Sequence, residues 1–294
     1  MANLKEVRTR IQSVKSTQQI TKAMKMVAAS KLRRAQDAIL QMRPYVEKLS
    51  GILENTIASL EGSHQSEYSV AREVEKTLVV VITSDRGLCG AFNTNAIKSA
   101  LSLIEEKYQQ QETSNNLWIL PIGKKAFKYF SKRNYQVIDN FYEIFSDLTF
   151  EKAKEAAEYA MLGFINEEFD TVELVYNEFK NVATQVLRTE QFLPIVKEAS
   201  DEKVDSSTDY IFEPSVEFIV KELIPRTLKV QLYKAILESN ASEHGARMTA
   251  MGQATENAGD LLKELRLVYN RSRQAAITTE ILEIVGGAEA LSNG

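Results

Sequence analysis

Apolar residues recur at alternating steps of three and four over residues 1–60. This spacing is typical of a helix that buries one narrow stripe against a second helix, and its length of about eight heptads favours a two-helix coiled coil. Pro44 lies off the stripe and is expected to kink the helix without ending it. Thirteen of the seventeen stripe positions are apolar, so the pattern is sustained; they are Leu4, Val7, Ile11, Val14, Gln18, Thr21, Lys25, Ala28, Leu32, Ala35, Ile39, Met42, Val46, Leu49, Leu53, Thr56 and Leu60.

A second long helix is predicted over 214–291, with a kink at Pro225. Small residues crowd its middle, and three glycines recur there every seven residues on one helical face: Gly245, Gly252 and Gly259. Glycine disfavours a helix, so three in register indicate close packing against a partner or local flexibility. A conventional apolar stripe follows from Leu261 to Leu282. The two end helices therefore predict an antiparallel coiled coil whose turn is replaced by a folded domain.

The segment 76–196 alternates apolar, strand-like runs with helix-like stretches. This alternation predicts a mostly parallel, Rossmann-like sheet, whose last strand should run antiparallel because too few residues precede it for a crossover. The polar segment 197–213 is predicted to be a loop and connection. The fold class is therefore α/β: a long antiparallel coiled coil of the N- and C-terminal helices with an inserted Rossmann-like α/β domain. The predicted strands cover 78–83, 117–123, 135–138, 171–176 and 184–192, and the predicted helices cover 91–110, 125–132 and 151–167.

The loop 84–90, with sequence SDRGLCG, follows the first strand, where a phosphate-binding loop would lie. It has neither GxGxxG nor GxxxxGK[ST], which argues against a nucleotide cofactor. Cys89 could be a nucleophile near a helix N-terminus, but neither histidine is close in sequence, so a small structural residue is favoured. Asp85 and Arg86 are better explained as a turn-capping carboxylate and a surface cation than as a catalytic pair. We expect no catalytic residue, cofactor or metal site.

The single cysteine excludes an internal disulfide, and His64 and His244 are too distant in sequence to favour a zinc site. No apolar run approaches the length of a membrane span, and no signal peptide precedes the heptads. These features predict a cytoplasmic protein of bacterial type.

Charge is distributed unevenly along the chain. Residues 1–48 hold eleven Lys or Arg against three Asp or Glu, a balance of +8, which leaves −12 for the remainder of a chain with net charge −4. A basic helix could bind nucleic acid, an anionic membrane or an acidic protein. Tyr45 is the only aromatic residue among these cations, so the segment has no series of aromatics to stack bases; acidic protein partners are favoured and nucleic acid is not expected.

Three motifs in order resemble the γ subunit of F-type ATP synthase. They are ITKAMKMVAASKLRRAQ at 20–36, ITSDRGLCGAFN at 82–93, and ESNASEHGARMTAM followed by VYNRSRQAAITTEILEIVGGA. The resemblance implies a non-catalytic central rotor shaft inside a hexamer of three α and three β subunits. The shaft would couple ion flow through the membrane c-ring to conformational change in the catalytic β subunits, and so to ATP synthesis or hydrolysis.

The resemblance also implies partners and contact residues. The α/β domain would lie near the ε subunit and the c-ring, peripheral to the cytoplasmic face of the bacterial inner membrane. The β subunits of this family bear an acidic loop, and the basic N-terminal helix would complement its charge. Contact with the β subunits is implied for Met24, Arg247, Arg273, Gln274, Thr278, Glu280 and Glu283, and contact on the ε or c-ring side for Tyr210.

Two other functions compete with the rotor. A dimeric coiled-coil scaffold without rotary function requires the heptads to pair between chains, whereas one end helix offers large residues and the other offers gaps, as expected for pairing within one chain. A small-molecule enzyme of the Rossmann type requires a cofactor loop, which the sequence lacks. The rotor is therefore preferred.

Overall fold

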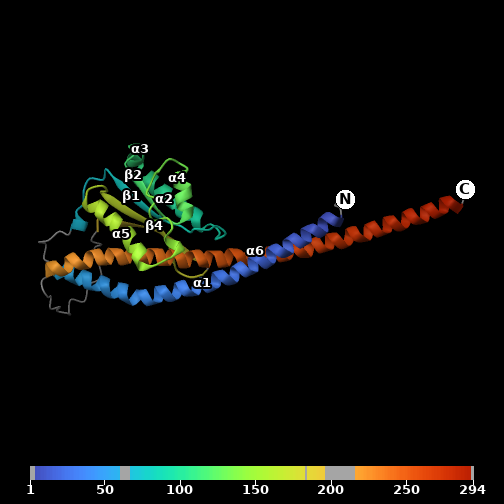
Figure 1. Cartoon of the computed structure of the whole chain (residues 1–294), viewed down its shortest axis with the longest axis horizontal. Coiled ribbons are helices and arrows are strands. Elements are labelled where there is room, and N and C mark those ends of the chain that lie inside the picture. The colour runs from blue at the N-terminus through green and yellow to red at the C-terminus, as the bar shows by residue number, and fades with distance from the viewer. Residues whose placement is uncertain (1–3, 60–66, 183, 196–215, 293–294) are drawn as a thin grey trace. The chain divides into compact units, whose positions relative to one another are not determined.

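The computed structural model describes residues 4–59, 67–182, 184–195 and 216–292 (Figure 1). Helix α1 spans Leu4–Ser59 and helix α6 spans Val216–Ser292, with Pro44 and Pro225 inside them. The elements between them form a five-stranded sheet with its helices, so the predicted fold class is confirmed. The chain divides into two compact units, and each contains part of both long helices: Ala29–Arg247, and Met1–Ala28 with Met248–Gly294.

The sheet in the unit Ala29–Arg247 has the strand order β3-β2-β1-β4-β5. Strand β1 pairs in parallel with β2 and β4, and β2 pairs in parallel with β3. Only β4 and β5 are antiparallel, which confirms the direction predicted for the last strand. The strands are β1 (Thr77–Ile82), β2 (Leu117–Ile122), β3 (Gln136–Val137), β4 (Thr171–Phe179) and β5 (Gln185–Leu193).

Helices cover both faces of this sheet. All six residues of β1 are buried, as expected for a central strand with helices on either side. One face packs against α5 and the segment of α6 from Ile224 to Ile236, and the other packs against α2 and α4 (Figure 1). The remaining elements are α2 (Phe92–Lys107), α3 (Gln109–Thr113), α4 (Lys124–Ser131), α5 (Phe150–Ile165) and two short 3-10 helices, η1 (Glu67–Ser69) and η2 (Ile144–Ser146).

The turn from β2 into α4 depends on a glycine. Gly123 has φ +105°, a conformation that L side chains rarely adopt, and a Cβ there would collide with the carbonyl oxygen of Thr83. The close approach lets the Thr83 hydroxyl accept a hydrogen bond from the Ala126 amide at 2.9 Å. The end of β1 is thereby fixed just before the loop that follows it.

In the unit Ala29–Arg247, α1 and α6 run antiparallel. The guanidinium of Arg226 lies 5.6 Å from the ring centroid of Tyr45, while Ile39, earlier in α1, lines the same groove as Leu237, later in α6. The stripe position Ile39 is buried, as predicted for the inner face of a coiled coil.

The unit Met1–Ala28 with Met248–Gly294 repeats this arrangement with smaller residues. The Gln18 amide donates to the carbonyl oxygen of Thr255 at 3.4 Å, and the hydroxyls of Thr21 and Thr255 lie 2.9 Å apart. A Cβ on Gly252 would lie 3.4 Å from the Lys25 ammonium, and one on Gly259 would lie 3.0 Å from the Gln18 amide nitrogen. Side chains of α1 therefore lie against both glycines, which supports close packing, one of the two alternatives that the glycine spacing left open.

Candidate functional site: an exposed helix end and a buried arginine

The end of α6 is uncovered by the described part of the chain. Every residue from Arg273 to Glu289 is exposed, although the sequence predicted that the apolar stripe would continue to Leu282. In that stripe Leu261 is half-buried and Leu265 is buried, whereas Leu282 is 65% exposed. An apolar face nevertheless persists at positions spaced three and four apart, which lie on one side of a helix: Ile277, Ile281, Ile284 and Val285.

The predicted contact residues of this helix end lie on the same exposed segment. The side chains of Arg273, Glu280 and Glu283 are exposed and form no ion pair with another described residue. The Thr278 hydroxyl donates to the carbonyl oxygen of Gln274 at 2.9 Å, a bond within the helix. The polar groups of this segment are thus largely available to a partner.

Met24 lies half-buried on α1 in the smaller unit. The same segment carries the exposed cations Lys22 and Lys25, which border a groove of about 530 Å³ shared with Gly252 and Thr255. Three apolar side chains on this segment are more than half exposed: Ile20, Met26 and Val27. Cations and exposed apolar groups side by side are suited to a protein surface that is both acidic and apolar.

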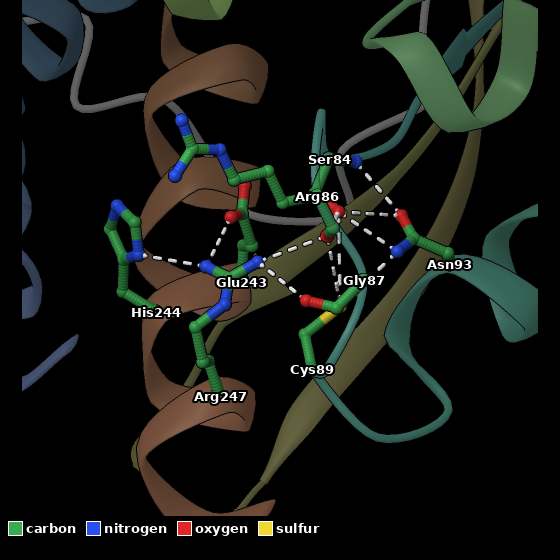
Figure 2. A network of polar contacts seen from close by, with 8 residues as sticks. All are labelled: Ser84, Arg86, Gly87, Cys89, Asn93, Glu243, His244 and Arg247. Carbon is green, nitrogen blue, oxygen red and sulfur yellow. Dashed lines mark hydrogen bonds and ion pairs between the residues drawn. The ribbon is translucent and has the colours of Figure 1, made fainter. Parts of the chain in front are cut away.

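Arg247 differs from the other predicted residues because it is buried, with 9% of its surface exposed. One guanidinium nitrogen donates to the Glu243 carboxylate and lies 3.3 Å from Nδ1 of His244. The other donates to the carbonyl oxygens of Arg86 at 3.0 Å and Gly87 at 3.2 Å (Figure 2). The guanidinium therefore bridges α6 and the loop after β1.

A second set of contacts holds this loop from the other side. The Ser84 amide donates to the side-chain oxygen of Asn93 at 2.8 Å, and the Asn93 amide nitrogen donates to the Cys89 sulfur at 3.1 Å (Figure 2). Cys89 is 1% exposed, which supports the small structural residue predicted there. Leu88 lies in the loop between Ser84 and Asn93, has φ +64° and is exposed to solvent. The loop's polar groups are engaged with one another.

Burial dominates the electrostatics of this network. Burial lowers the pKa of His244 to about 4, and the charges of Arg247 and Lys31 add to the effect, so the ring is neutral near pH 7. Burial raises the pKa of Glu243, against the opposing effect of Arg247. Burial also raises the pKa of Cys89, which keeps the sulfur a thiol and a poor nucleophile.

Two further predictions concern Asp85 and Tyr210. The Asp85 carboxylate accepts a hydrogen bond from the Lys124 amide at 3.1 Å, so it joins the loop to α4. Tyr210 lies outside the described residues. Among those residues, no group of three or more His, Cys, Asp or Glu is placed to hold a metal ion. In the same part of the chain, no helix is long and apolar enough to cross a membrane.

Sequence reasoning did not identify the partners of Arg247. Glu243, His244 and Arg247 share one face of α6, and their spacing of one to four residues was visible in the sequence. The acceptors in the loop lie about 160 residues away, and they are main-chain carbonyls, which carry no residue-specific signal. Only the fold brings them together.

Two long end helices flank an inserted α/β domain, and the end of the second helix is left exposed by the described part of the chain. The model of the family described as ATP synthase matches residues 3–291. An ATP synthase gamma chain from Cytophaga hutchinsonii is 60% identical over 295 residues, covering 100% of both chains. The chain therefore belongs to the ATP synthase gamma-chain family.

Solved structures agree with this assignment. A chain of the central stalk and c-ring structure of Tetrahymena thermophila mitochondrial ATP synthase matches with TM-score 0.56 and 25% identity, covering 80% of this chain and 99% of that one. A chain of the Euglena gracilis mitochondrial enzyme matches in fold with TM-score 0.67 and 23% identity, covering 98% and 94%. The chain is accordingly a central-stalk subunit of ATP synthase and not a catalytic one.

Proposed function

We propose that this central shaft couples ion flow through a membrane c-ring to conformational change in catalytic β subunits, with the end of α6 inside a hexamer of three α and three β subunits. The exposed apolar face of Ile277, Ile281 and Ile284 carries the proposal. A contiguous apolar face on a soluble protein is typical of a protein–protein contact. A shaft must offer unlike faces to three subunits in turn, which a single helix with one apolar side does.

In this proposal the polar residues beside that face bind the β subunits. Arg273 and Gln274 offer donors to a β-subunit loop, while Thr278, Glu280 and Glu283 adjoin them on the exposed segment. Their lack of ion pairs within the described chain supports this role for the three charged members.

The basic segment of α1 around Met24 makes a second proposed contact. Lys22 and Lys25 flank Met24, and an acidic loop of a β subunit would complement these charges. Arg247 belongs to the proposed set through its motif, although its four hydrogen-bonding neighbours lie within the chain. Its role is developed in the next subsection.

The proposed foot of the shaft binds the ε subunit and the c-ring, with Tyr210 on that side. This assignment rests on the DYIFEP motif at 209–214. Contact with a c-ring would hold the chain at the cytoplasmic face of the bacterial inner membrane as a peripheral subunit.

Native mass spectrometry of the captured chain tests the proposal. An affinity tag inserted at 199–208, a polar stretch distant in sequence from the N-terminal end of α1 and the C-terminal end of α6, should recover one copy with three each of two larger nucleotide-binding chains. Recovery of a homodimer, or of a monomer with bound nucleotide, would favour the scaffold or the enzyme instead.

A matched pair of variants locates the contact. Ile281→Asp places a charge in the middle of the exposed apolar face of α6, where Ile281 is 54% exposed, and should reduce recovery of the larger chains about 10-fold or more. Leu162→Asp makes the equivalent change on α5, where Leu162 is 57% exposed, and should leave recovery unchanged. Equal recovery with both variants would exclude the end of α6 as a main contact.

A further inference from the structure

Arg247 joins helix α6 to the loop after β1. Its guanidinium serves the Glu243 carboxylate on its own helix and two carbonyl oxygens, those of Arg86 and Gly87, in the loop after β1 (Figure 2). The planar fork of an arginine can bond a carboxylate and two carbonyls at once, which an ammonium cannot do with the same geometry. With 9% of its surface exposed, the group is largely shielded from competing water.

The loop that it holds is under conformational constraint. Leu88 adopts φ +64°, which is unfavourable for a bulky residue and persists only where the surroundings impose it. Asn93 fixes one side of the loop through Ser84 and Cys89, and Arg247 fixes the other. Without the arginine, one of the two restraints that keep Leu88 in this conformation is lost.

The loop is also well placed to transmit force. It follows directly from β1, the central strand of the sheet, so a restraint on the loop acts on the middle of the α/β domain. The other end of the restraint is α6, the helix whose exposed end is proposed to meet the β subunits. Arg247 is therefore a polar link between the sheet and the shaft helix, additional to the apolar packing of Leu232 and Ile236.

We propose that Arg247 is a positioning residue that locks the 84–93 loop onto α6, so that this helix and the α/β domain turn as one body. This inference rests on the proposed function, because only a rotating shaft needs to pass torque between helix and domain. It gives Arg247 an intrachain role that the motif does not assign, since the motif implies contact with a β subunit.

Cys89 provides a native probe of the lock. It is the only cysteine of the chain and is 1% exposed inside the loop, so a thiol reagent reaches it only when the loop opens. In the purified full-length chain, Arg247→Gln should speed labelling of Cys89 by 5,5′-dithiobis(2-nitrobenzoate) about 10- to 100-fold, because charge-assisted hydrogen bonds to the loop are lost. An unchanged labelling rate would overturn the lock.

Two variants separate locking from general stability. Arg72→Gln removes a comparable guanidinium bond, from Arg72 to the carbonyl oxygen of Phe164 at 2.9 Å, elsewhere in the α/β domain and should not speed labelling. Arg247→Lys keeps a charge beside Glu243 without the fork, so its labelling rate should fall between those of wild type and Arg247→Gln. The accelerated rate should be nearly independent of dilute urea, which marks a local opening; a rate that follows global unfolding would contradict the proposal.

Ion pumping per ATP hydrolysed, measured in the assembled complex, tests the consequence. Arg247→Gln should lower this ratio, Arg247→Lys should restore it in part, and Arg72→Gln should leave it at the wild-type value. Fast labelling with an unchanged ratio would overturn the role in torque transfer. If the wild-type chain fails to assemble with α and β subunits, the proposed function fails, while the labelling rates still decide whether Arg247 locks the loop.

Discussion

The described parts of α6 use the same kinds of residue in two different settings. Near its start, Leu228, Leu232 and Ile236 are at most 2% exposed because they pack against the sheet. Near its end, Ile281 and Ile284 are 54% and 66% exposed, although their spacing is just as helical. Apolar periodicity therefore identifies the residues that share a face, but it does not say whether the chain itself or a partner covers that face.

Two arginines of α6 show the same contrast in polar form. Arg247 is buried and its hydrogen bonds are made within the chain, whereas Arg273 is exposed and forms no ion pair with a described residue. The difference separates residues that shape the subunit from residues that are available to other subunits. A family motif can include both kinds without distinguishing them.

The largest effect is expected from a substitution in the buried part of α6. Ile236→Ala should lower the free energy of unfolding by about 2 to 5 kcal/mol, because Ile236 is fully buried and its loss leaves a cavity. Ile284→Ala, the same change at an exposed position, should alter it by no more than about 0.5 kcal/mol. Denaturant unfolding followed by fluorescence of the only tryptophan, Trp118, measures both. Equal effects would show that the exposed end is covered within the chain.

A smaller loss of stability is expected when the pH is lowered toward the pKa of the buried His244. His244 has a folded pKa of about 4, below its ordinary 6.5, so between these values the unfolded chain binds a proton that the folded chain does not. Its contribution to stability is complete above about pH 6.5 and is lost as pH falls toward 4. The loss between pH 7.5 and pH 5 should be about 2 kcal/mol.

His244→Gln isolates this contribution. Burial raises the pKa of Glu243, so that residue acts in the opposite sense and stabilises the fold as pH falls. Subtracting the unfolding free energies of the His244→Gln variant from those of the wild type removes this term at each pH. The difference should move in favour of the variant between pH 7.5 and pH 5; a constant difference would mean that His244 titrates normally.

Two glycine substitutions in α6 compare its exposed end with a position that packs against α1. A Cβ at Gly286 would meet no atom within 4 Å, so Gly286→Ala should stabilise the local helix by about 0.5 to 1 kcal/mol. At Gly259 a Cβ would lie 3.0 Å from the Gln18 amide nitrogen, so the same substitution should gain less. Amide hydrogen exchange of the residues around each site measures the change. Equal protection gains would show that Gly259 is not closely packed.

The smallest effect is expected at the tip. Removal of residues 291–294 deletes Leu291, which is 87% exposed, and terminal helical turns fray easily. The melting temperature and the composition of the assembled complex should both stay at wild-type values. Loss of the larger chains in native mass spectrometry would instead make the tip a required bearing.

Most of the fold could be predicted because its signals are local. The run LVVVIT at 78–83 indicated a strand buried on both faces, and β1 is Thr77–Ile82. The short link before β5 required an antiparallel partner, as observed. The helix 91–110 is divided into α2 and α3 at Tyr108, whose hydroxyl donates to the buried Glu173 at 2.7 Å. No local sequence pattern predicts this hydrogen bond between Tyr108 and Glu173.

The site could be predicted only through resemblance. The motif RSRQAA marked Arg273 and Gln274, and the structure adds that both are exposed. Arg247 was marked in the same way, but its burial depends on a loop in a different part of the chain. The exposure of Leu282 could not be foreseen from an apolar stripe, because a stripe carries no information about which surface covers it.

The uncovered apolar end of α6 also bears on how the subunit is produced in a cell. A copy that finds no assembly partner keeps Ile277, Ile281 and Val285 in contact with water, where they can associate with one another or bind chaperones. The same segment is an accessible starting point for a protease. We therefore expect surplus copies to be short-lived, with synthesis matched to that of the partner chains, because the face proposed to bind partner subunits stays exposed on a chain that has not assembled.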